Sequence, residues 1–372
     1  MSLVFYRKYR PRLFKEITGQ EITVKVLTKA IKEGQISHAY LFAGPRGTGK
    51  TTTARLLAKA LNCQNRKAGS FEPCNECESC LAAENGTNLD IIEIDAASHT
   101  GVDDIRELIE NIKFPPVKFK YKVFIIDEAH QLSKSAFNAL LKTLEEPPSY
   151  AVFILASTEP EKFLPTILSR VQRYDFKRIA LEDIIHELQM VAKKEGLQIE
   201  DDALRLIASN ANGGMRDAES VLGQVASMFG KDKITLDALQ KILGSINFSS
   251  LSKFSATILD KDIGKAIQMV NDLNEKGYNL DELSRALLDY FRWLLLIKVS
   301  PATEQLISRE TTDEELDTLK KQAARATADQ IESFIKALMD QLSRTKKAGL
   351  ATLPLELAII DSVGINPQEK SA

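Results

Sequence analysis

The sequence predicts a doubly wound α/β domain at the N-terminus, followed by a chain that is helical throughout. Between Ser37 and about Phe176, short apolar runs alternate with segments of helical period, which is typical of a parallel sheet with helical crossovers. All four cysteines lie in one stretch within this region, which indicates an inserted module. After Leu181 the strand pattern stops, and amphipathic helical segments continue to about Ile365.

Four apolar runs are the predicted strands of the sheet. The run AYLFAG (39–44) precedes a helix that begins at Lys50, and each later run is followed by a segment of helical period. The later runs are LDIIEID (89–95), KVFIID (122–127) and AVFILAS (151–157). Strands that are apolar on both sides belong to a sheet with helices on both faces. The cysteine stretch lies between the first helix and the second strand, so we expect an insertion at about residues 62–82.

Composition and charge limit the class of protein. The chain has 372 residues, of which 44% are hydrophobic, and its 49 Lys and Arg nearly balance 51 Asp and Glu. This length predicts two or three domains, and the near-neutral charge excludes a basic coat that binds nucleic acid over the whole surface. The first residues become basic before any long apolar run, and no stretch approaches 18 uncharged apolar residues. We therefore expect no signal peptide, no membrane contact and a cytoplasmic location.

The cysteines have a spacing that favours a metal site. Cys63, Cys74, Cys77 and Cys80 form the pattern C-x10-C-x2-C-x2-C. A C-x2-C pair places two sulfurs on one side of an ion, and four thiolates suit tetrahedral Zn²⁺ in a closed structural site. Disulfide or redox chemistry and an iron–sulfur centre are the alternatives. No Lys or Arg occurs from 68 to 105, where nine acidic residues lie, so the module would repel phosphate and is interpreted as a brace or a protein-contact surface.

The segment from Gly44 to Thr51 fits the motif G-x-x-x-x-G-K-[ST], after a predicted strand and at the start of a helix. In such a loop the backbone N–H groups surround phosphates, Lys50 contacts the β and γ oxygens, and the Thr51 hydroxyl binds Mg²⁺. A glycine-rich turn without a ligand is the alternative. The expected nucleotide-binding residues here are Gly44, Pro45, Arg46, Gly47, Thr48, Gly49, Lys50, Thr51 and Thr52.

Two acidic residues follow the third predicted strand. We expect Asp127 to hold Mg²⁺, often through water, and Glu128 to orient and activate an attacking water. Paired acids at the start of a solvated helix are the alternative. His130, two residues further on, is expected to have a structural role. Ser157 and Thr158 end the strand expected beside the loop strand, and Thr158 is the residue expected to sense the γ-phosphate.

Several segments together resemble one family. They are YRKYRPRLFKEITGQE, HAYLFAGPRGTGKTTTARLLAKALNC, the C-x2-C-x2-C insertion, IIDEAHQLSKSAFNALLKTLEEPP and TILSR. The set is similar to the gamma/tau subunit of bacterial DNA polymerase III, the ATP-hydrolysing AAA+ subunit of the replicative clamp loader. The resemblance is dense over residues 1–243 and weaker through the last third of the chain.

The resemblance implies a domain plan and a function. We expect an AAA+ ATPase domain at 1–178, a helical lid domain at 179–243, an all-α collar domain for oligomerisation at 244–365 and a polar tail at 366–372. With ATP, Mg²⁺ and Zn²⁺ as cofactors, the protein would open a sliding clamp and load it on primed DNA. Expected partners are clamp-loader subunits of its own kind and of the delta and delta-prime types, the sliding clamp, and primer–template DNA. The alternatives are a non-hydrolysing structural loader subunit and another AAA+ motor, such as a branch-migration helicase.

The resemblance also implies roles for residues outside the loop. Arg170 resembles the family's arginine finger, which reaches the ATP of a neighbouring subunit, although Val171 stands where the family usually has Cys. A helix C-terminal cation is the alternative for Arg170. Arg216, at the start of a helix of the second domain, resembles the second sensor. The segment that folds over the adenine is matched by Tyr9, Arg10 and Pro11, with Gly19 and Gln20.

The resemblance also implies contacts to the DNA backbone, which in the family come partly from the helix after the second strand. Some relatives carry Arg or Lys in the segment that is Ser98–Gly101 here, and this sequence offers only His99, ahead of Asp103 and Asp104. The basic run from Phe114 to Lys122 is interpreted as the approach to a strand. No single DNA-contacting residue is therefore assigned.

Overall fold

The computed structural model describes residues 4–67, 69–98, 102–230, 232–243, 246–300, 303–307, 311–344 and 350–363. It divides into two compact units, Met1–Ile234 and Thr235–Ala372. No helix in these ranges is both long and apolar enough to span a membrane.

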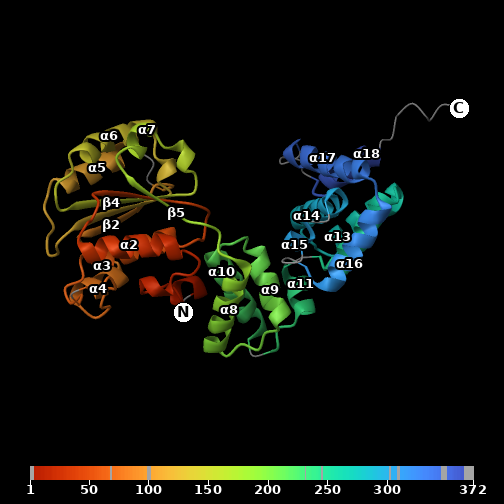
Figure 1. Ribbon diagram of the computed structural model, residues 1–372, viewed down its shortest axis with the longest axis horizontal. Helices are drawn as coiled ribbons and strands as arrows, with labels where there is room; N and C mark the ends of the chain where they lie inside the picture. Colours follow the sequence, from red (N-terminus) through yellow and green to blue (C-terminus); the bar gives the residue numbers. More distant parts are fainter. Residues whose placement is uncertain are drawn as a thin grey trace. The chain divides into compact units, whose positions relative to one another are not determined.

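A five-stranded parallel sheet forms the centre of the first unit (Figure 1). Its strands are β1 (Ala39–Ala43), β2 (Ile91–Asp95), β3 (Lys122–Asp127), β4 (Ala151–Ser157) and β5 (Gln172–Asp175), in the order β2-β3-β4-β1-β5. The four predicted strands are confirmed, and β4 lies beside β1 as expected, with Ala43 opposite Ser157. Strand β5 was not predicted, because it has four residues and only Tyr174 among them is buried, so it shows no apolar run.

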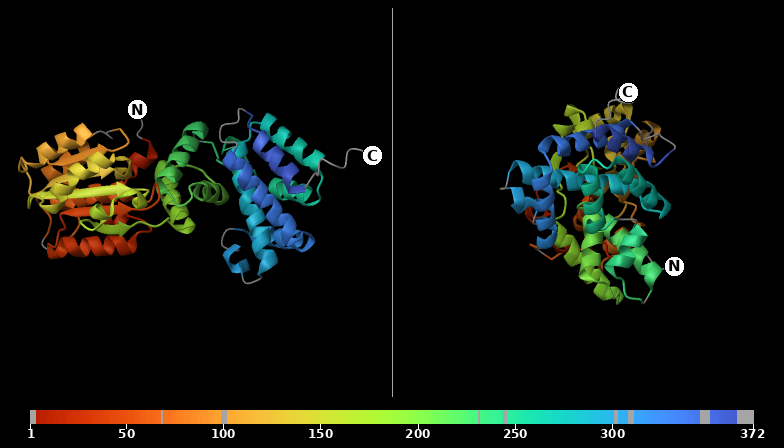
Figure 2. Two further views of the ribbon diagram at one scale, coloured as in Figure 1. Left: turned by 90° about the horizontal axis from the view of Figure 1, so that it is seen from above. Right: turned by 90° about the vertical axis from the view of Figure 1, so that its right-hand side faces the viewer.

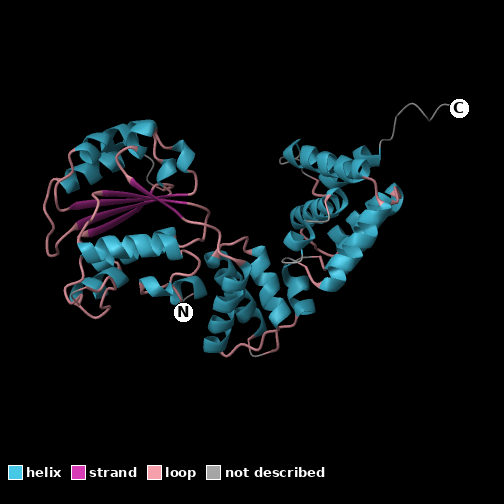
Figure 3. Cartoon of the chain, viewed as in Figure 1, coloured by secondary structure: helices cyan, strands magenta, loops and turns pink. Residues whose placement is uncertain are grey.

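Helices cover both faces of the sheet, and the alternation of side chains along β1 explains why. Ala39, Leu41 and Ala43 face one core, together with α5 (Val102–Ile112), α6 (Lys134–Glu145) and α7 (Pro165–Leu168). Tyr40 and Phe42 face the other core, with α2 (Glu21–Glu33) and α3 (Lys50–Leu61). Each fully buried Leu or Phe contributes about 1.5–3 kcal/mol relative to exposure. Figure 3 shows the two helical layers with the strands between them.

Several short elements lie between the strands and the longer helices along the chain. The N-terminal segment contains α1 (Phe5–Lys8) and the 3₁₀ turn η1 (Phe14–Glu16). The insertion after α3 ends with α4 (Glu78–Asn85). Two further 3₁₀ turns, η2 (Ala129–Gln131) and η3 (Pro160–Lys162), follow β3 and β4.

Three helices follow the sheet in the first unit, in the region after Leu181 where amphipathic helical segments are predicted. They are α8 (Leu181–Glu195), α9 (Asp201–Asn210) and α10 (Met215–Phe229). Helix α8 has two acids in its first turn and two lysines in its last, which suits the helix dipole. It ends at Gly196, whose φ of 69° is the left-handed cap that glycine favours.

The second unit contains only helices among its described residues (Figures 2 and 3). These are α11 (Leu236–Leu243), α12 (Phe248–Leu259), α13 (Ile263–Glu275), α14 (Leu280–Val299), α15 (Glu304–Ile307), α16 (Asp313–Arg325), α17 (Ala328–Arg344) and α18 (Leu353–Val363). Their core is aromatic and aliphatic, with the rings of Phe291 and Phe334 centred 4.3 Å apart. Helix α14 begins with a polar cap, because the Asn279 side chain accepts from two backbone N–H groups of the first turn.

Candidate nucleotide and metal sites

The loop between β1 and α3 lies at the carboxyl end of an inner strand, where parallel sheets bind their ligands. Three glycines give it its path, since Gly44, Gly47 and Gly49 have φ of 148°, 76° and 98°. A Cβ on Gly44 would lie 2.3 Å from the carbonyl oxygen of Phe176, so no other residue fits there without moving the backbone. The loop therefore presents its backbone close to whatever occupies it.

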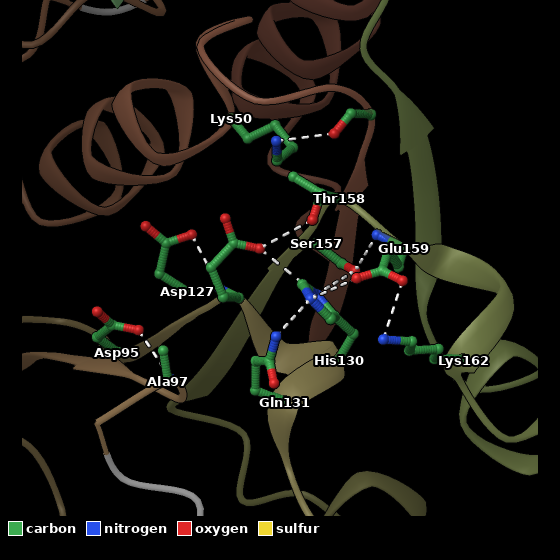
Figure 4. A network of polar contacts seen from close by, with 12 residues as sticks. Lys50, Asp95, Ala97, Asp127, His130, Gln131, Ser157, Thr158, Glu159 and Lys162 are labelled. Carbon is green, nitrogen blue, oxygen red and sulfur yellow. Dashed lines mark hydrogen bonds and ion pairs between the residues drawn. The ribbon is translucent and has the colours of Figure 1, made fainter. Parts of the chain in front are cut away.

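Lys50 points into this loop. Its side-chain nitrogen donates to the carbonyl oxygens of Gly44 and Pro45, at 2.8 Å each, and the residue is 6% exposed (Figure 4). Burial lowers the pKa of Lys50, while the carboxylates of Glu128 and Asp127 oppose that shift. A buried ammonium among loop carbonyls can exchange those bonds for stronger, charge-assisted bonds to phosphate oxygens.

Thr51 and Asp127 meet at the first turn of α3. The Thr51 hydroxyl donates to Oδ2 of Asp127 at 2.8 Å, although the two residues are 76 positions apart in the chain. Hydroxyl and carboxylate oxygens are ligands that Mg²⁺ prefers, so this pair fits the predicted magnesium site. The neighbouring Thr52 is half-buried on the same turn, and Thr48 is fixed by a 2.8 Å bond to the Pro45 carbonyl.

Glu128 occupies a strained position directly after β3. Its φ of 46° is left-handed, a conformation that costs a non-glycine residue about 1–2 kcal/mol and that clusters at functional sites. Oε2 of Glu128 accepts from the Thr158 hydroxyl at 3.2 Å and lies 3.4 Å from Nδ1 of His130. The sheet therefore brings the predicted water-orienting acid and the predicted γ-phosphate sensor into contact.

His130 links this pair to a wider network (Figure 4). Nδ1 lies 3.1 Å from the Ser157 hydroxyl, and Nε2 lies 3.2 Å from Oε1 of Glu159 and 3.1 Å from the amide nitrogen of Gln131. Glu159 in turn pairs with Lys162, whose hydrogen bond and charge lower the pKa of Glu159. Sequence reasoning did not find Glu159, because a lone acid in a loop has no motif to identify it.

Arg170 follows α7 on the surface of the first unit. Its guanidinium donates to the Thr166 carbonyl at 2.6 Å and to Oε1 of Glu145 at 2.7 Å, and its side chain is 31% exposed. The bond to Thr166 is the one expected of a cation at a helix C-terminus. Within the described ranges Arg170 contacts Thr166, Ser169 and Glu145 but no residue of the loop that follows β1. These contacts do not connect Arg170 to the chain's own site.

The start of α10 lies against the loop between β1 and α3, which is called the phosphate loop below after its predicted ligand. A Cβ on Gly47 would lie 3.0 Å from Cα of Gly214, and Nε of Arg46 lies 4.0 Å from Oδ1 of Asp217. Arg216, predicted as the second sensor, is exposed here, and its guanidinium is 4.9 Å from the ring centroid of Tyr6, a cation–π distance. The helix that carries Arg216 is thus next to the loop, while its side chain rests on the N-terminal segment.

The N-terminal segment is fastened to α8. The Tyr9 hydroxyl and the Lys8 ammonium both donate to Oε1 of Glu195, each at 2.5 Å. Burial and the bond to Glu195 raise the pKa of Tyr9. Arg10 and Pro11 are half-buried beside it. Gln20 exchanges two hydrogen bonds with the Lys177 backbone, at 2.7 and 3.0 Å.

The four cysteines converge as the spacing predicted. Their sulfur atoms all lie within 4.8 Å of one another, and all four are free thiols. The backbone N–H groups of Cys74 and Cys77 point at the sulfurs of Cys63 and Cys74, at 3.3 and 3.2 Å. Burial would raise the pKa of Cys77, but backbone N–H groups of Cys80 and Gln64 bring it down to about 6. Four convergent sulfurs with N–H groups that favour thiolates fit a closed four-coordinate zinc site. We call residues 63–85, up to the end of α4, the cysteine insert.

The segment expected to approach DNA is only partly within the described ranges. Ser98 closes a turn at Asp95, with its N–H 3.1 Å from the Asp95 carbonyl, and His99, Thr100 and Gly101 lie outside the described residues.

Three family models match the chain in sequence order. They are DNA polymerase III, delta subunit, over residues 19–180; DNA polymerase III clamp loader subunit, ATPase lid domain, over 183–231; and DNA polymerase III subunits gamma and tau domain III, over 234–370. The ranges of the three models cover both units of the structure.

Curated relatives agree with these models. The tau subunit of DNA polymerase III from Bacillus subtilis is 46% identical over 317 residues, which are 85% of this chain and 56% of the relative. The gamma/tau subunit of Mycobacterium tuberculosis H37Rv is 35% identical over 95% of this chain and 61% of its own. The chain spans about half the length of the curated relatives it matches. Among solved structures, the RuvB branch-migration motor of Thermotoga maritima aligns with 67% of this chain and 79% of its own at 22% identity and a TM-score of 0.46, which carries no functional argument.

Proposed function

This chain belongs to the family of bacterial DNA polymerase III gamma and tau subunits, and from that membership we propose that it binds and hydrolyses ATP as the motor of a replicative clamp loader. ATP turnover would open a sliding clamp and release it around primer–template DNA. The observation that carries the proposal is the meeting of Lys50, Thr51, Asp127 and Glu128 at one edge of the sheet. A scaffold subunit has no need of all four side chains, which disfavours the non-hydrolysing alternative.

The proposed roles follow from the contacts. The Lys50 ammonium and the backbone N–H groups from Gly44 to Thr52, apart from Pro45, which has none, bind the phosphates. Thr51 and Asp127 hold Mg²⁺. The magnesium ion, when bound, neutralises phosphate charge during transfer. Glu128, fixed between Thr158 and His130, orients the attacking water, and the Thr158 hydroxyl lies where it can exchange Glu128 for a γ-phosphate oxygen.

Three further roles rest on the family. Tyr9, Arg10 and Pro11 cover the adenine. Arg216, whose guanidinium lies over the Tyr6 ring here, would turn toward the phosphates of its own site, and its position at the start of a helix that touches Gly47 supports this. Arg170 serves the neighbouring subunit's nucleotide, for which its half-exposed surface position is suitable.

The wider assembly is proposed on the same basis. The domains are an ATPase domain at 1–178, a lid at 179–243, a collar at 244–365 that joins subunits, and a polar tail at 366–372. Partners are further copies of the chain, delta and delta-prime type subunits, the sliding clamp and primed DNA, in the cytoplasm. Zn²⁺ occupies the four-cysteine site and is structural, because four protein thiolates leave no position open for substrate.

A pair of variants tests the proposal. Lys50→Ala should lose nucleotide binding, because it removes a cation that contacts the phosphates in the ground state. Glu128→Gln should bind ATP as the wild type does and lose turnover, because orienting the water acts on the transition state. ATP binding and phosphate release are measured with and without clamp and primed DNA. Glu146→Gln, an exposed acid at the end of α6, is the control for charge and should behave as the wild type. Wild-type turnover by Glu128→Gln would refute the assignment.

A further inference from the structure

The proposed function above gives the cysteine insert no role at the nucleotide site, but its contacts with the N-terminal segment point to one. We propose that the insert positions the N-terminal segment over the nucleotide through the carboxylate of Glu72, so that metal loading of the insert sets the affinity for ATP. This inference rests on the proposed function, because it concerns the segment that we place over the adenine. Glu72 is a positioning residue in this proposal and touches neither phosphate nor metal.

The strongest observation is the binding of four consecutive backbone N–H groups by two carboxylates. The N–H groups of Arg12 and Leu13 donate to Oε2 of Glu16, at 2.7 and 3.1 Å. Those of Phe14 and Lys15 donate to the two carboxylate oxygens of Glu72, at 2.7 and 3.0 Å. The first N–H groups of a helical turn have no partner within it. One cap of η1 is therefore local, and the other comes from the insert, 57 to 58 positions along the chain.

Packing fixes the same contact. Phe14 is fully buried, and its ring meets Phe71 of the insert edge-on, with centroids 6.2 Å apart. The Lys32 ammonium lies 4.9 Å from the Phe71 centroid, on the side of α2. Phe71 and Glu72 are adjacent in sequence, so a shift of this part of the insert would displace an apolar and a charge-assisted contact together.

A second set of contacts joins the insert to Arg12. The Asn75 side chain donates to the Arg12 carbonyl at 3.3 Å, and the Arg12 guanidinium lies 2.6 Å from a carboxylate oxygen of Glu84. Glu84 also lies 3.5 Å from the ammonium of Lys59 in α3, the helix that begins at the phosphate loop. The insert thus holds the chain at Arg12, one residue after the predicted adenine-contacting residues.

The remaining contacts connect the segment to both sides of the nucleotide site. Before the insert contacts, Lys8 and Tyr9 bind Glu195 of α8. After them, the Thr18 hydroxyl donates to Oε1 of Glu187, also on α8, at 3.3 Å. The side chain of Ile17 lies 4.0 Å from the position of a Cβ on Gly49 in the phosphate loop. The insert therefore holds the segment between its two points of attachment to α8.

Metal enters the argument through the position of Glu72 in the chain. Glu72 lies in the loop between Cys63 and Cys74, so an ion that joins these cysteines closes that loop and reduces the conformations open to Glu72. We expect the cap on η1 to weaken when the metal is removed.

The expected size follows from population arithmetic. If the released segment occupies its binding position about one tenth of the time, the apparent dissociation constant for ATP rises about tenfold. Tenfold corresponds to about 1.4 kcal/mol. The maximal turnover should stay unchanged, because Glu72 touches none of the residues proposed for the chemistry. The expected signature is therefore a raised KM with an unchanged kcat.

The experiment compares Glu72→Ala with Glu76→Ala in the full chain. Both changes remove one acid from the insert, but Glu76 is exposed, and among the described residues its carboxylate makes no hydrogen bond or ion pair. Binding of a fluorescent ATP analogue, steady-state kinetics, zinc content and hydrogen exchange of amides 12–15 are measured for each. Glu72→Ala should bind about tenfold more weakly and exchange faster at Phe14 and Lys15 while keeping its zinc. Glu76→Ala should match the wild type.

Two further arms keep the outcomes distinct. Glu72→Gln retains one acceptor oxygen, so its affinity for the ATP analogue should fall about threefold. This variant replaces Glu72→Ala if Glu72→Ala does not fold. Wild-type protein depleted of zinc should lose affinity as Glu72→Ala does, and regain it when zinc returns. Wild-type affinity in Lys50→Ala would refute the proposed function itself. Binding that depends on Lys50 but is unchanged by Glu72→Ala, or by zinc removal, would overturn this inference alone.

Discussion

Gly47→Ala tests the contact between the phosphate loop and α10. Gly47 has a φ of 76°, where an L-residue costs roughly 1–2 kcal/mol more than glycine. An added Cβ would also lie 3.0 Å from Cα and 3.3 Å from the carbonyl carbon of Gly214, closer than an ordinary van der Waals contact. Both neighbours are backbone atoms, so the loop or the start of α10 must move by a few tenths of an ångström. Such overpacking adds roughly 1–3 kcal/mol.

Gly34→Ala is the matched control. Gly34 ends α2 with a φ of 70°, and nothing lies within 4 Å of the Cβ position there. It therefore bears the same backbone cost without the contact, and we expect a loss of about 1 kcal/mol. For a unit of this size, each kcal/mol lowers the melting temperature by about 2–4 °C. Gly47→Ala should melt several degrees below Gly34→Ala.

Nucleotide affinity separates the two variants further. Gly47→Ala should weaken ATP binding by tenfold or more, because displaced loop N–H groups no longer converge on the phosphates. Gly34→Ala should bind as the wild type does. Thermal melting and titration with a fluorescent nucleotide measure both effects. Equal melting temperatures and equal affinities in the two variants would refute the close approach of Gly47 to Gly214.

Three further predictions concern other residues. Arg170→Ala and Glu128→Gln should each be inactive as assembled oligomers, but a mixture of the two should recover part of the ATPase activity. At some interfaces of the mixture, an intact Arg170 of one subunit faces an intact Glu128 of its neighbour. No recovery in confirmed mixed oligomers would favour the helix-terminus role of Arg170. Metal analysis should find one zinc per chain, and Cys77→Ser should lose the zinc together with the protection of the insert's amides from hydrogen exchange. Iron, or no metal, in the wild-type protein would contradict the zinc assignment. Burial and, to a smaller extent, the nearby carboxylate of Glu187 raise the pKa of Glu219 from 4.5 to about 8. Between these two pH values the folded protein keeps the Glu219 proton, whereas the unfolded chain releases it. Stability should accordingly fall as the pH rises from about 5 to 8, and Glu219→Gln should flatten that part of the profile; an unchanged slope in pH-dependent unfolding would contradict it.

Much of the fold could be predicted because its signals are local. Strands β1, β3 and β4 are apolar on both faces, and this alone marks inner strands of a covered sheet. The start of α14 can be predicted from Asn279, because asparagine is a favoured N-cap residue whose side chain bonds backbone N–H groups within three residues. Strand β5 gave no such signal, because it is an edge strand with three exposed residues of four, and its place beside β1 depends on the rest of the sheet.

The candidate site divides in the same way. The residue types of the phosphate loop and of the Asp127–Glu128 pair follow from motifs in which neighbours in sequence act on one ligand. Sequence also placed the cysteines, because metal ligands in a short loop have restricted spacings. The contacts of Glu72, Glu159 and Glu195 could not be predicted from the sequence. Each is a single acidic residue outside any motif, and its partner lies next to it only in the folded chain.

The sequence alone thus determined which side chains are available to the candidate sites: a glycine-rich loop with Lys50 and Thr51, the Asp127–Glu128 pair and four cysteines. Only the tertiary structure decided which of these groups meet. Strand order set Thr51 beside Asp127 and Glu128 beside Thr158, and the insert reached the N-terminal segment at Phe14. The physical reason is that such contacts join residues tens of positions apart, and their energy exists only after the sheet has formed and brought the segments together.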